Sequence, residues 1–309
     1  MMSVEINQLV LNWHLTEACN YECQYCYAKW GTDDNRKNII SKPQSREKLL
    51  IELYNFFRPN NDKNVLKAEL SWAGIRLNLA GGEPLIYDKW LPDTAKQASM
   101  LGMDVSLITN GSRLTSPAFE RLVPYLTMLG ISIDSIRDST NLLIGRKSRH
   151  GKLLDLDEVR QLLITAKHVN PRLRLKINTV INALNWHEDM TALITDLSPE
   201  KWKVLKMLPV VDERLRITDS EFSQFISRHR ALSSIMYSED GTDMRESYIM
   251  IDPYGRFYQN NSNGLGYNYS SPILEVGAAA AFNQLVFNAQ KFCNRYSAIS
   301  DRANYEIQL

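Results

Sequence analysis

The sequence lacks four features, each of which would have placed it in a particular class of protein. The net charge of the 309 residues is only +1, which excludes a global electrostatic attraction to nucleic acid or to an anionic membrane. No apolar run reaches the length of a membrane span. The N-terminus shows no signal peptide, and the chain contains no internal repeat or low-complexity tract. We therefore expect a soluble, cytoplasmic protein that binds neither membranes nor nucleic acid.

Cysteine is also scarce, and its distribution is uneven. Of the four cysteines, Cys19, Cys23 and Cys26 lie in one short stretch, whereas Cys293 lies near the C-terminus. This distribution differs from the even-numbered disulfide framework of a small secreted domain. It suits a reducing cytosol, in which clustered thiols stay available to bind metal.

Short apolar, β-rich runs alternate with amphipathic stretches, which favours an α/β fold. Most of the runs are followed by a loop with Gly, Asn, Ser or charged residues, where the active sites of barrels are built. Strands are expected at 9–15, 76–80, 104–109, 129–134, 173–181 and 202–208, and helices at 45–57, 91–102 and 156–169. We predict a partial (βα)6 TIM barrel over residues 1–208, since six strands are too few to close the eight-stranded form.

The pattern changes from about residue 209, so residues 209–309 are predicted to form a C-terminal extension that covers the barrel mouth. Within it, residues 221–235 have the pattern of a helix, and residues 246–260 that of a hairpin turning at 252–255. Residues 260–271 are rich in Gly and Asn and are expected to form a loop.

The three clustered cysteines follow the first predicted strand with the spacing CxxxCxxC. Thiolates this close in sequence can bind one soft metal centre. A structural zinc site usually has four protein ligands, whereas a [4Fe–4S] cluster can take three cysteines and leave one iron open for another ligand. Two alternatives stay open from the residues alone: the cysteines bind no metal, or Cys293 is the fourth ligand of a zinc ion.

The cysteine spacing, with the aromatic Tyr25 before the last cysteine, resembles the signature of radical S-adenosylmethionine (SAM) enzymes. A second similarity is Gly81-Gly82-Glu83-Pro84, directly after a predicted strand. Glycines let the backbone approach a ligand closely, and Glu83 can accept a hydrogen bond from an ammonium group.

The resemblance implies that Cys19, Cys23 and Cys26 hold a [4Fe–4S] cluster whose open iron binds SAM. It also implies that Asn110 and Ser132, which end two later strands, and Arg146 contact SAM. The alternative for the two strand-end groups is helix capping.

Asn12 and His14 extend the motif to NxHx4CxxxCxxC, which resembles the viperin family of radical SAM enzymes. Similar stretches continue in the same order at 141–146, 176–182, 188–191, 202–208 and 246–257. The resemblance implies conversion of a ribonucleoside triphosphate (CTP, UTP or GTP) to its 3′-deoxy-3′,4′-didehydro analogue, which terminates viral or phage RNA chains. The implied steps are reductive SAM cleavage, abstraction of the ribose 4′ hydrogen, loss of the 3′ hydroxyl as water and a one-electron reduction. An electron donor such as a flavodoxin or ferredoxin is the implied partner.

Polar side chains are spaced to share one face of several predicted strands. The pairs are Asn12 with His14, Lys176 with Asn178, and Lys201 with Lys203, and Arg76 lies on the strand before GGEP. Inward cations have no evident structural role because an unpaired buried charge is costly, so they can neutralise a triphosphate. The alternative is that they face solvent or pair with acids.

The resemblance assigns these seven residues to nucleotide binding and places Tyr248 beside the substrate ribose. We expect Tyr248 to deliver the hydrogen or proton that completes the product; the alternative is a packing role. The remaining histidines, which follow no ligand spacing, are expected at the surface: His150, His168, His187 and His229.

Two departures from the viperin family bear on these expectations. The first strand begins within ten residues of the N-terminus, without the amphipathic membrane helix of animal members, which indicates a prokaryotic enzyme without membrane attachment. The stretch 260–271 has no counterpart of one phosphate-binding lysine, and amides of its glycines could replace it as an anion nest. The rivals are another radical SAM enzyme (a nucleotide cyclase or a peptide maturase) and a non-catalytic metal-binding interaction protein. A single distant Cys293 counts against a maturase.

Overall fold

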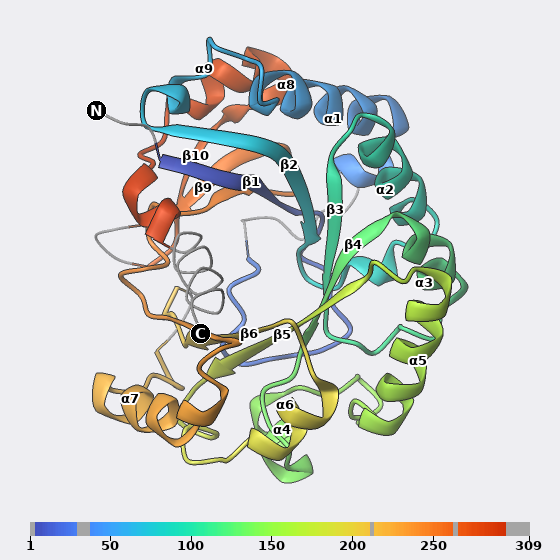
Figure 1. Ribbon diagram of the computed structural model, residues 1–309, viewed down its shortest axis with the longest axis vertical. Coiled ribbons are helices and arrows are strands. Elements are labelled where there is room, and N and C mark those ends of the chain that lie inside the picture. The colour runs from blue at the N-terminus through green and yellow to red at the C-terminus, as the bar shows by residue number, and fades with distance from the viewer. Residues whose placement is uncertain (1–3, 30–37, 211–212, 262–264, 295–309) are drawn as a thin grey trace, which may run out of the picture.

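The computed structural model describes residues 4–29, 38–210, 213–261 and 265–294 and contains one ten-stranded sheet. Its strand order is β10-β9-β8-β1-β2-β3-β4-β5-β6-β7. The sheet curves around a lumen, and its edge strands β7 and β10 do not pair with each other among the described residues (Figure 1). The strands are β1 Val4–His14, β2 Leu70–Ala80, β3 Asp104–Thr109, β4 Leu126–Ser132, β5 Arg174–Ile181, β6 Lys201–Lys206, β7 Met236–Glu239, β8 Ile249–Ile251, β9 Arg256–Asn260 and β10 Tyr267–Pro272.

The predicted partial barrel is confirmed, and its six strands β1–β6 run parallel in chain order. Helices cover the outer face of the curved sheet (Figure 1). They are α1 Pro43–Phe57, α2 Leu91–Met100, α3 Pro117–Leu122, α4 Asp138–Ile144, α5 Leu156–Val169, α6 Thr191–Leu197 and α7 Asp219–Arg228, followed by α8 Ile273–Val276 and α9 Ala278–Phe282.

Buried apolar and partly buried polar side chains alternate along β5, so this strand contributes to two surfaces, the outer face and the lumen. Leu175 and Ile177 are buried, whereas Lys176 and Asn178 are only partly buried and line cavities in the lumen. Successive side chains of a strand point to opposite faces. The apolar set therefore packs against the helices, and the polar set faces the interior of the barrel.

The C-terminal segment joins the same sheet. The hairpin predicted at 246–260 is confirmed, because β8 pairs with β9 in antiparallel register and with β1 in parallel register. The expected loop at 260–271 is wrong in part, since Tyr267–Pro272 form strand β10 beside β9. The rings of Tyr267 and Tyr269 pack on that of Tyr258, at centroid distances of 5.1 and 6.2 Å. This alternation of aromatic residues, rather than the Gly and Asn content, decides the local structure.

The helix predicted at 221–235 ends at Arg228, and the surface position expected for His229 is wrong. His229 is fully buried, with its Nδ1 2.8 Å from the carbonyl oxygen of Phe225, and its Nε2 accepts a hydrogen bond from the Met190 amide at 2.8 Å. Burial lowers the pKa of this imidazole, so His229 is a neutral core residue that joins α7 to the start of α6.

Two further observations concern Cys293 and the helices. Cys293 is 1% exposed and belongs to the hydrophobic core beside Phe292. Among the described residues, no helix combines the length and the apolar composition needed to cross a bilayer.

Candidate active site

The cysteine loop follows β1 at the carboxyl end of the parallel strands, and the GGEP segment packs directly against it. The Gly82 amide donates to the Thr16 carbonyl at 2.6 Å, and the Glu83 amide donates to the Ala18 carbonyl at 2.9 Å. A Cβ added to Gly82 would lie 2.1 Å from the Ala18 oxygen. The close approach that requires glycine at this position is therefore to the chain that leads into Cys19, where the sequence alone had indicated a ligand.

Glu83 is fully buried and connects this segment to the end of β3. Its Oε1 accepts hydrogen bonds from the Leu85 amide at 3.0 Å and the Thr109 hydroxyl at 2.7 Å, and its Oε2 accepts one from the Asn110 amide at 2.7 Å. Burial raises the pKa of the carboxyl group, and these hydrogen bonds oppose that effect. The predicted contact of Glu83 with an ammonium group stays a prediction.

The thiols of Cys19, Cys23 and Cys26 are partly buried, and burial raises the pKa of each, that of Cys23 to about 11. Donors surround them: the Cys19 sulfur accepts from the Tyr21 amide at 3.4 Å and from Asn110 Nδ2 at 3.7 Å. Across the described residues, no three His, Cys, Asp or Glu side chains converge as ligands of a single metal ion would. A [4Fe–4S] cluster differs from such a site because each thiolate binds a separate iron.

A buried ion pair lies beside Cys23. Arg146 Nε is 3.4 Å from Asp134 Oδ2, and its Nη1 donates to the Tyr25 hydroxyl at 3.3 Å and approaches the Cys23 sulfur at 3.9 Å. Tyr25 in turn donates to Asp134, and Arg146 also donates to the carbonyl oxygen of Ser132. The predicted residues Tyr25 and Ser132 thus both bond to the third, Arg146, and Asp134, which was not among the predicted site residues, bonds to Tyr25 and pairs with Arg146.

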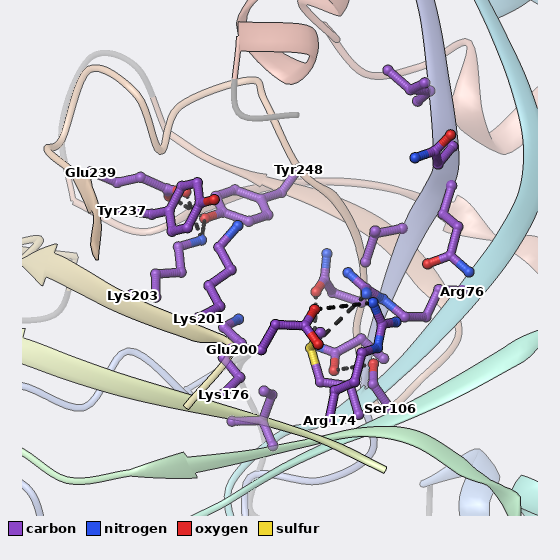
Figure 2. Close-up of a pocket in the computed structure, with 18 of the residues that line it drawn as sticks. Arg76, Ser106, Arg174, Lys176, Glu200, Lys201, Lys203, Tyr237, Glu239 and Tyr248 are labelled. Carbon is purple, nitrogen blue, oxygen red and sulfur yellow. Dashed lines mark hydrogen bonds and ion pairs between the residues drawn. The ribbon is translucent and has the colours of Figure 1, made fainter. Parts of the chain in front are cut away.

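Below the loop, a cavity of about 410 Å³ extends through the lumen toward the amino ends of the strands. Figure 2 shows Lys176, Lys201 and Lys203 reaching into it from the neighbouring strands β5 and β6, with Arg76 of β2 on the other side, and Arg174 lies two residues before Lys176 on β5. Burial and then the cations Lys203, Lys201 and Arg76 hold the pKa of Lys176 well below its usual value, and Glu239 opposes them. Five cations line the cavity against three carboxylates, those of Glu5, Glu200 and Glu239, so its lining has an excess of positive charge although the whole chain is nearly neutral.

Tyr248 lies between two charged groups at the side of this cavity. Its hydroxyl donates to Glu239 and accepts from the Lys203 ammonium group, and Lys203 Nζ is 2.7 Å from Glu239 Oε1 (Figure 2). Lys203 and Glu239 are each less than a tenth exposed. Sequence reasoning missed Glu239 together with strand β7. Residues 236–239 do not alternate between apolar and polar, so the local sequence held no clear signal for this strand.

A second cavity of about 180 Å³ adjoins the first and shares Asn12, Lys176, Lys203 and Tyr248 with it. His14 lines it and bonds through Nδ1 to the Tyr258 hydroxyl. Burial lowers the pKa of His14 to about 3, so its imidazole is neutral.

The amide side chains of Asn12 and Asn178, which line the same cavity as His14, differ in how many of their hydrogen-bonding atoms have a partner. Asn12 Oδ1 accepts from Asn78 Nδ2 at 2.9 Å, and Asn12 Nδ2 donates to the Ile249 carbonyl at 3.2 Å. Asn178 Oδ1, by contrast, is buried and accepts no hydrogen bond within the described part of the chain. A buried acceptor of this kind suits a donor on a bound ligand.

The predicted residues therefore form two groups. The cysteines, GGEP, Asn110, Ser132, Tyr25 and Arg146 surround the loop after β1, and the seven polar strand residues with Tyr248 line the lumen. The expected anion nest is not supported at Gly266, whose amide donates to the Val210 carbonyl at 3.0 Å. Residues 262–264 of that stretch lie outside the described residues.

Comparison with known proteins agrees with this architecture. The radical SAM superfamily matches residues 13–181. Relatives named S-adenosylmethionine-dependent nucleotide dehydratase include one from Psychrobacter lutiphocae, 40% identical, with 95% of this chain and 96% of its own aligned. A relative of that name from Danio rerio is 31% identical, with 92% and 76% aligned. The chain belongs to the viperin family of radical SAM enzymes.

Among solved structures, AdoMet-bound anSMEcpe is similar to this viperin-family chain with a TM-score of 0.58, over 94% of this chain and 80% of that one. At 13% identity the likeness concerns the fold alone. Radical SAM enzymes use a [4Fe–4S] cluster and SAM. The residues present fit that pair, because three thiols share the loop after β1 and hydrogen-bonding groups from β2, β3 and β4 surround it.

Proposed function

We propose that this enzyme is an antiviral nucleotide dehydratase that converts CTP, UTP or GTP to its 3′-deoxy-3′,4′-didehydro analogue. The observation that carries the proposal is the group of cations in the lumen, next to the cavity that Asn12 and His14 line below the cysteine loop. A triphosphate carries about four negative charges, and several converging cations are needed to bind it. The names of the bacterial relatives support the reaction class.

We further propose that the enzyme acts in the cytoplasm, and that residues 1–208 form the barrel unit and residues 209–309 the unit that closes the nucleotide site. The pairing of β8 with β1 supports the second part, because it holds Tyr248, the residue before β8, at the edge of the lumen.

Cys19, Cys23 and Cys26 would hold the cluster, and the groups around Glu83, Asn110 and Arg146 would hold SAM. When bound, the cluster and SAM supply a 5′-deoxyadenosyl radical that abstracts the ribose 4′ hydrogen. The protein's part is to exclude water and to align the ribose with that radical. Asn178 Oδ1, which is buried and unsatisfied within the described residues, is suited to accept a hydrogen bond from a ribose hydroxyl.

The lumen side chains then complete the reaction. After the 4′ hydrogen is removed, the 3′ hydroxyl must leave with one proton, as water, and the remaining substrate must gain one electron. Tyr248 can give that electron while its phenolic proton passes to Glu239, which accepts its hydrogen bond. The Lys203 ammonium group, which donates to the same oxygen, can protonate the hydroxyl. An electron from an external donor and a proton from solvent restore the site.

The experiment that tests the function is incubation of the reduced, reconstituted enzyme with SAM and each nucleoside triphosphate in turn. We expect a product lighter than its substrate by one water from at least one nucleotide, together with 5′-deoxyadenosine, both measured by mass spectrometry. Absence of such a product from all four common nucleotides would overturn the proposal. 5′-Deoxyadenosine without it would point to another radical SAM reaction.

Replacing Lys176 with methionine is expected to weaken nucleotide binding about tenfold to a hundredfold, the effect of losing a hydrogen bond to a charged group. Because the pKa of Lys176 is held well below its usual value, triphosphate binding should raise that pKa and take up a proton. Calorimetric titration in buffers of different ionisation enthalpy measures this uptake. Parent enzyme should take up protons, and the Lys176→Met enzyme should not.

The same substitution should stabilise the nucleotide-free protein. The folded-state pKa of Lys176 lies below its unfolded value, so the unfolded state binds more protons between the two values, and stability rises with pH through that window. Methionine removes this penalty. A lower free energy of unfolding for Lys176→Met, measured by urea denaturation at neutral pH, would show that Lys176 has a structural role instead.

A further inference from the structure

Exposed apolar and basic residues follow one another closely in sequence on α4 and in the segments directly before and after it. Ile136, Leu142 and Leu143 are 46%, 41% and 60% exposed. Arg137 and Arg149 are exposed beside them in sequence, and Lys147 is partly exposed. We call these six residues the α4 surface. Exposed apolar clusters with a polar rim mark interaction sites more often than isolated apolar residues do.

The α4 surface is attached to the backbone that carries Cys23. The Gln24 amide donates to the Ile144 carbonyl at 2.9 Å, and Gln24 Nε2 donates to the Leu143 carbonyl at 2.7 Å. The Glu22 amide donates to the Gly145 carbonyl at 3.2 Å. Both neighbours of Cys23 in the chain are thus hydrogen-bonded to α4 or its C-cap.

The end of α4 has little freedom to move away from this loop. Gly145 has φ +88°, and a Cβ there would lie 2.3 Å from the Glu22 oxygen. The next residue, Arg146, approaches the Cys23 sulfur at 3.9 Å. A protein bound on the α4 surface would therefore sit against the segment that holds a cluster ligand.

The α4 surface carries three cations, Arg137, Lys147 and Arg149, against Asp138 and the neighbouring Glu22. Lys152 next to it pairs with Glu158 at 4.0 Å. This small area therefore holds an excess of one positive charge, as much as the entire sequence. Such a patch attracts a negatively charged partner and speeds its encounter.

We propose that the α4 surface is the docking site of a small acidic electron-transfer protein that reduces the cluster. This rests on the proposed function, because the dehydration consumes two electrons, one for SAM cleavage and one for the substrate-derived radical. In each docking event the donor protein passes one electron to the enzyme, so the donor is oxidised by one electron and the cluster is reduced by one. Electron-transfer encounters use small, transient interfaces, which fits three exposed apolar side chains with three cations close to them in sequence.

The test compares two ways of delivering electrons. The reconstituted parent enzyme and the variants Leu143→Gln and Arg137→Glu/Arg149→Glu are supplied with reduced flavodoxin, with reduced ferredoxin, or with dithionite, and 5′-deoxyadenosine formation is measured. We expect the protein-driven rate of both variants to fall at least about tenfold, because lost charge and apolar contact lower productive encounter. The dithionite-driven rate should stay within about twofold of the parent, because dithionite needs no docking surface.

Matched controls come from α5. Ile164 is 52% exposed and Arg172 is exposed beyond the end of that helix. Ile164→Gln and Arg172→Glu therefore make the same kinds of change to the surface, at residues that take no part in the hydrogen bonds of the cysteine loop described above. They should retain the protein-driven rate. The parent rate should also fall as salt is raised, and the rate of the charge-reversed variant should depend less on salt.

Three outcomes would overturn the proposal: variants that keep the full protein-driven rate, variants that lose the dithionite-driven rate to the same extent, or a parent enzyme that neither donor reduces. A parent that is dimeric by size-exclusion chromatography and becomes monomeric with Leu143→Gln would assign the surface to a second copy instead. Failure of the proposed function is separable, because 5′-deoxyadenosine release reports electron delivery even when no nucleotide is dehydrated.

Discussion

Replacing Cys23 with alanine is expected to abolish product formation, a fall of at least about three orders of magnitude, because the protein's own side chains cannot supply the radical chemistry. The Cys23 sulfur lies 3.9 Å from Arg146 Nη1, and the residues before and after Cys23 are hydrogen-bonded to the end of α4. Contacts on both sides therefore hold Cys23. The variant should reconstitute with less iron and sulfide and with weaker visible absorbance. Both product formation and SAM cleavage are measured.

The matched control is Cys293→Ala. This cysteine lies in the hydrophobic core beside Phe292, so its loss should cost about 1 kcal/mol of stability through a small cavity. Iron content and product yield should match those of the parent. If Cys293→Ala lost the cofactor as Cys23→Ala does, the assignment of three ligands from one loop would be wrong, and a zinc site with four cysteines would return as the alternative.

Replacing Tyr248 with phenylalanine is expected to lower the yield of dehydrated nucleotide about a hundredfold, while SAM cleavage continues. Phenylalanine keeps the ring that packs over Lys203, 4.7 Å from its centroid, but loses the hydroxyl that bonds Glu239 and Lys203. The measurement is the ratio of dehydrated nucleotide to 5′-deoxyadenosine. The control is Tyr237→Phe on β7, which should leave that ratio unchanged.

The substitution Glu239→Gln tests whether Glu239 takes part in the reaction or only supports the fold around Tyr248. The amide retains the shape of the carboxylate but accepts the phenolic proton poorly, so kcat should fall about tenfold. Removing a negative charge from the cationic lumen should leave KM for the nucleotide unchanged or lower it. A residue that merely supports the fold would raise KM as well. An unchanged product ratio in both variants would remove Tyr248 and Glu239 from the reaction.

Several features were readable from local sequence because their causes are local. Strand β3 and helix α5 begin and end where the periodicity predicted, at Asp104–Thr109 and Leu156–Val169. The Asp155 side chain accepts from the Asp157 and Glu158 amides, so a residue next to the helix sets its start. The inward set of β5 followed from strand alternation alone.

Other features depended on partners distant in sequence, which no local pattern contains. His229 looked like a surface histidine, but its buried position follows from the Met190 amide, which lies 39 residues away in the chain. Glu239 entered the site only because β7 joins β6 in parallel register, an arrangement set by sheet topology.

The sequence by itself determined the partial barrel, through strand alternation, and it indicated the cofactor chemistry through the family resemblance that the cysteine spacing and GGEP carry, because these patterns are short segments of the chain. Tertiary structure alone decided how these pieces are used. It set GGEP against the cysteine loop, placed Glu239 and Lys203 on the Tyr248 hydroxyl, and joined α4 to the backbone around Cys23. Such contacts arise when strands far apart in sequence become neighbours, and that pairing is fixed by the packing of the whole sheet.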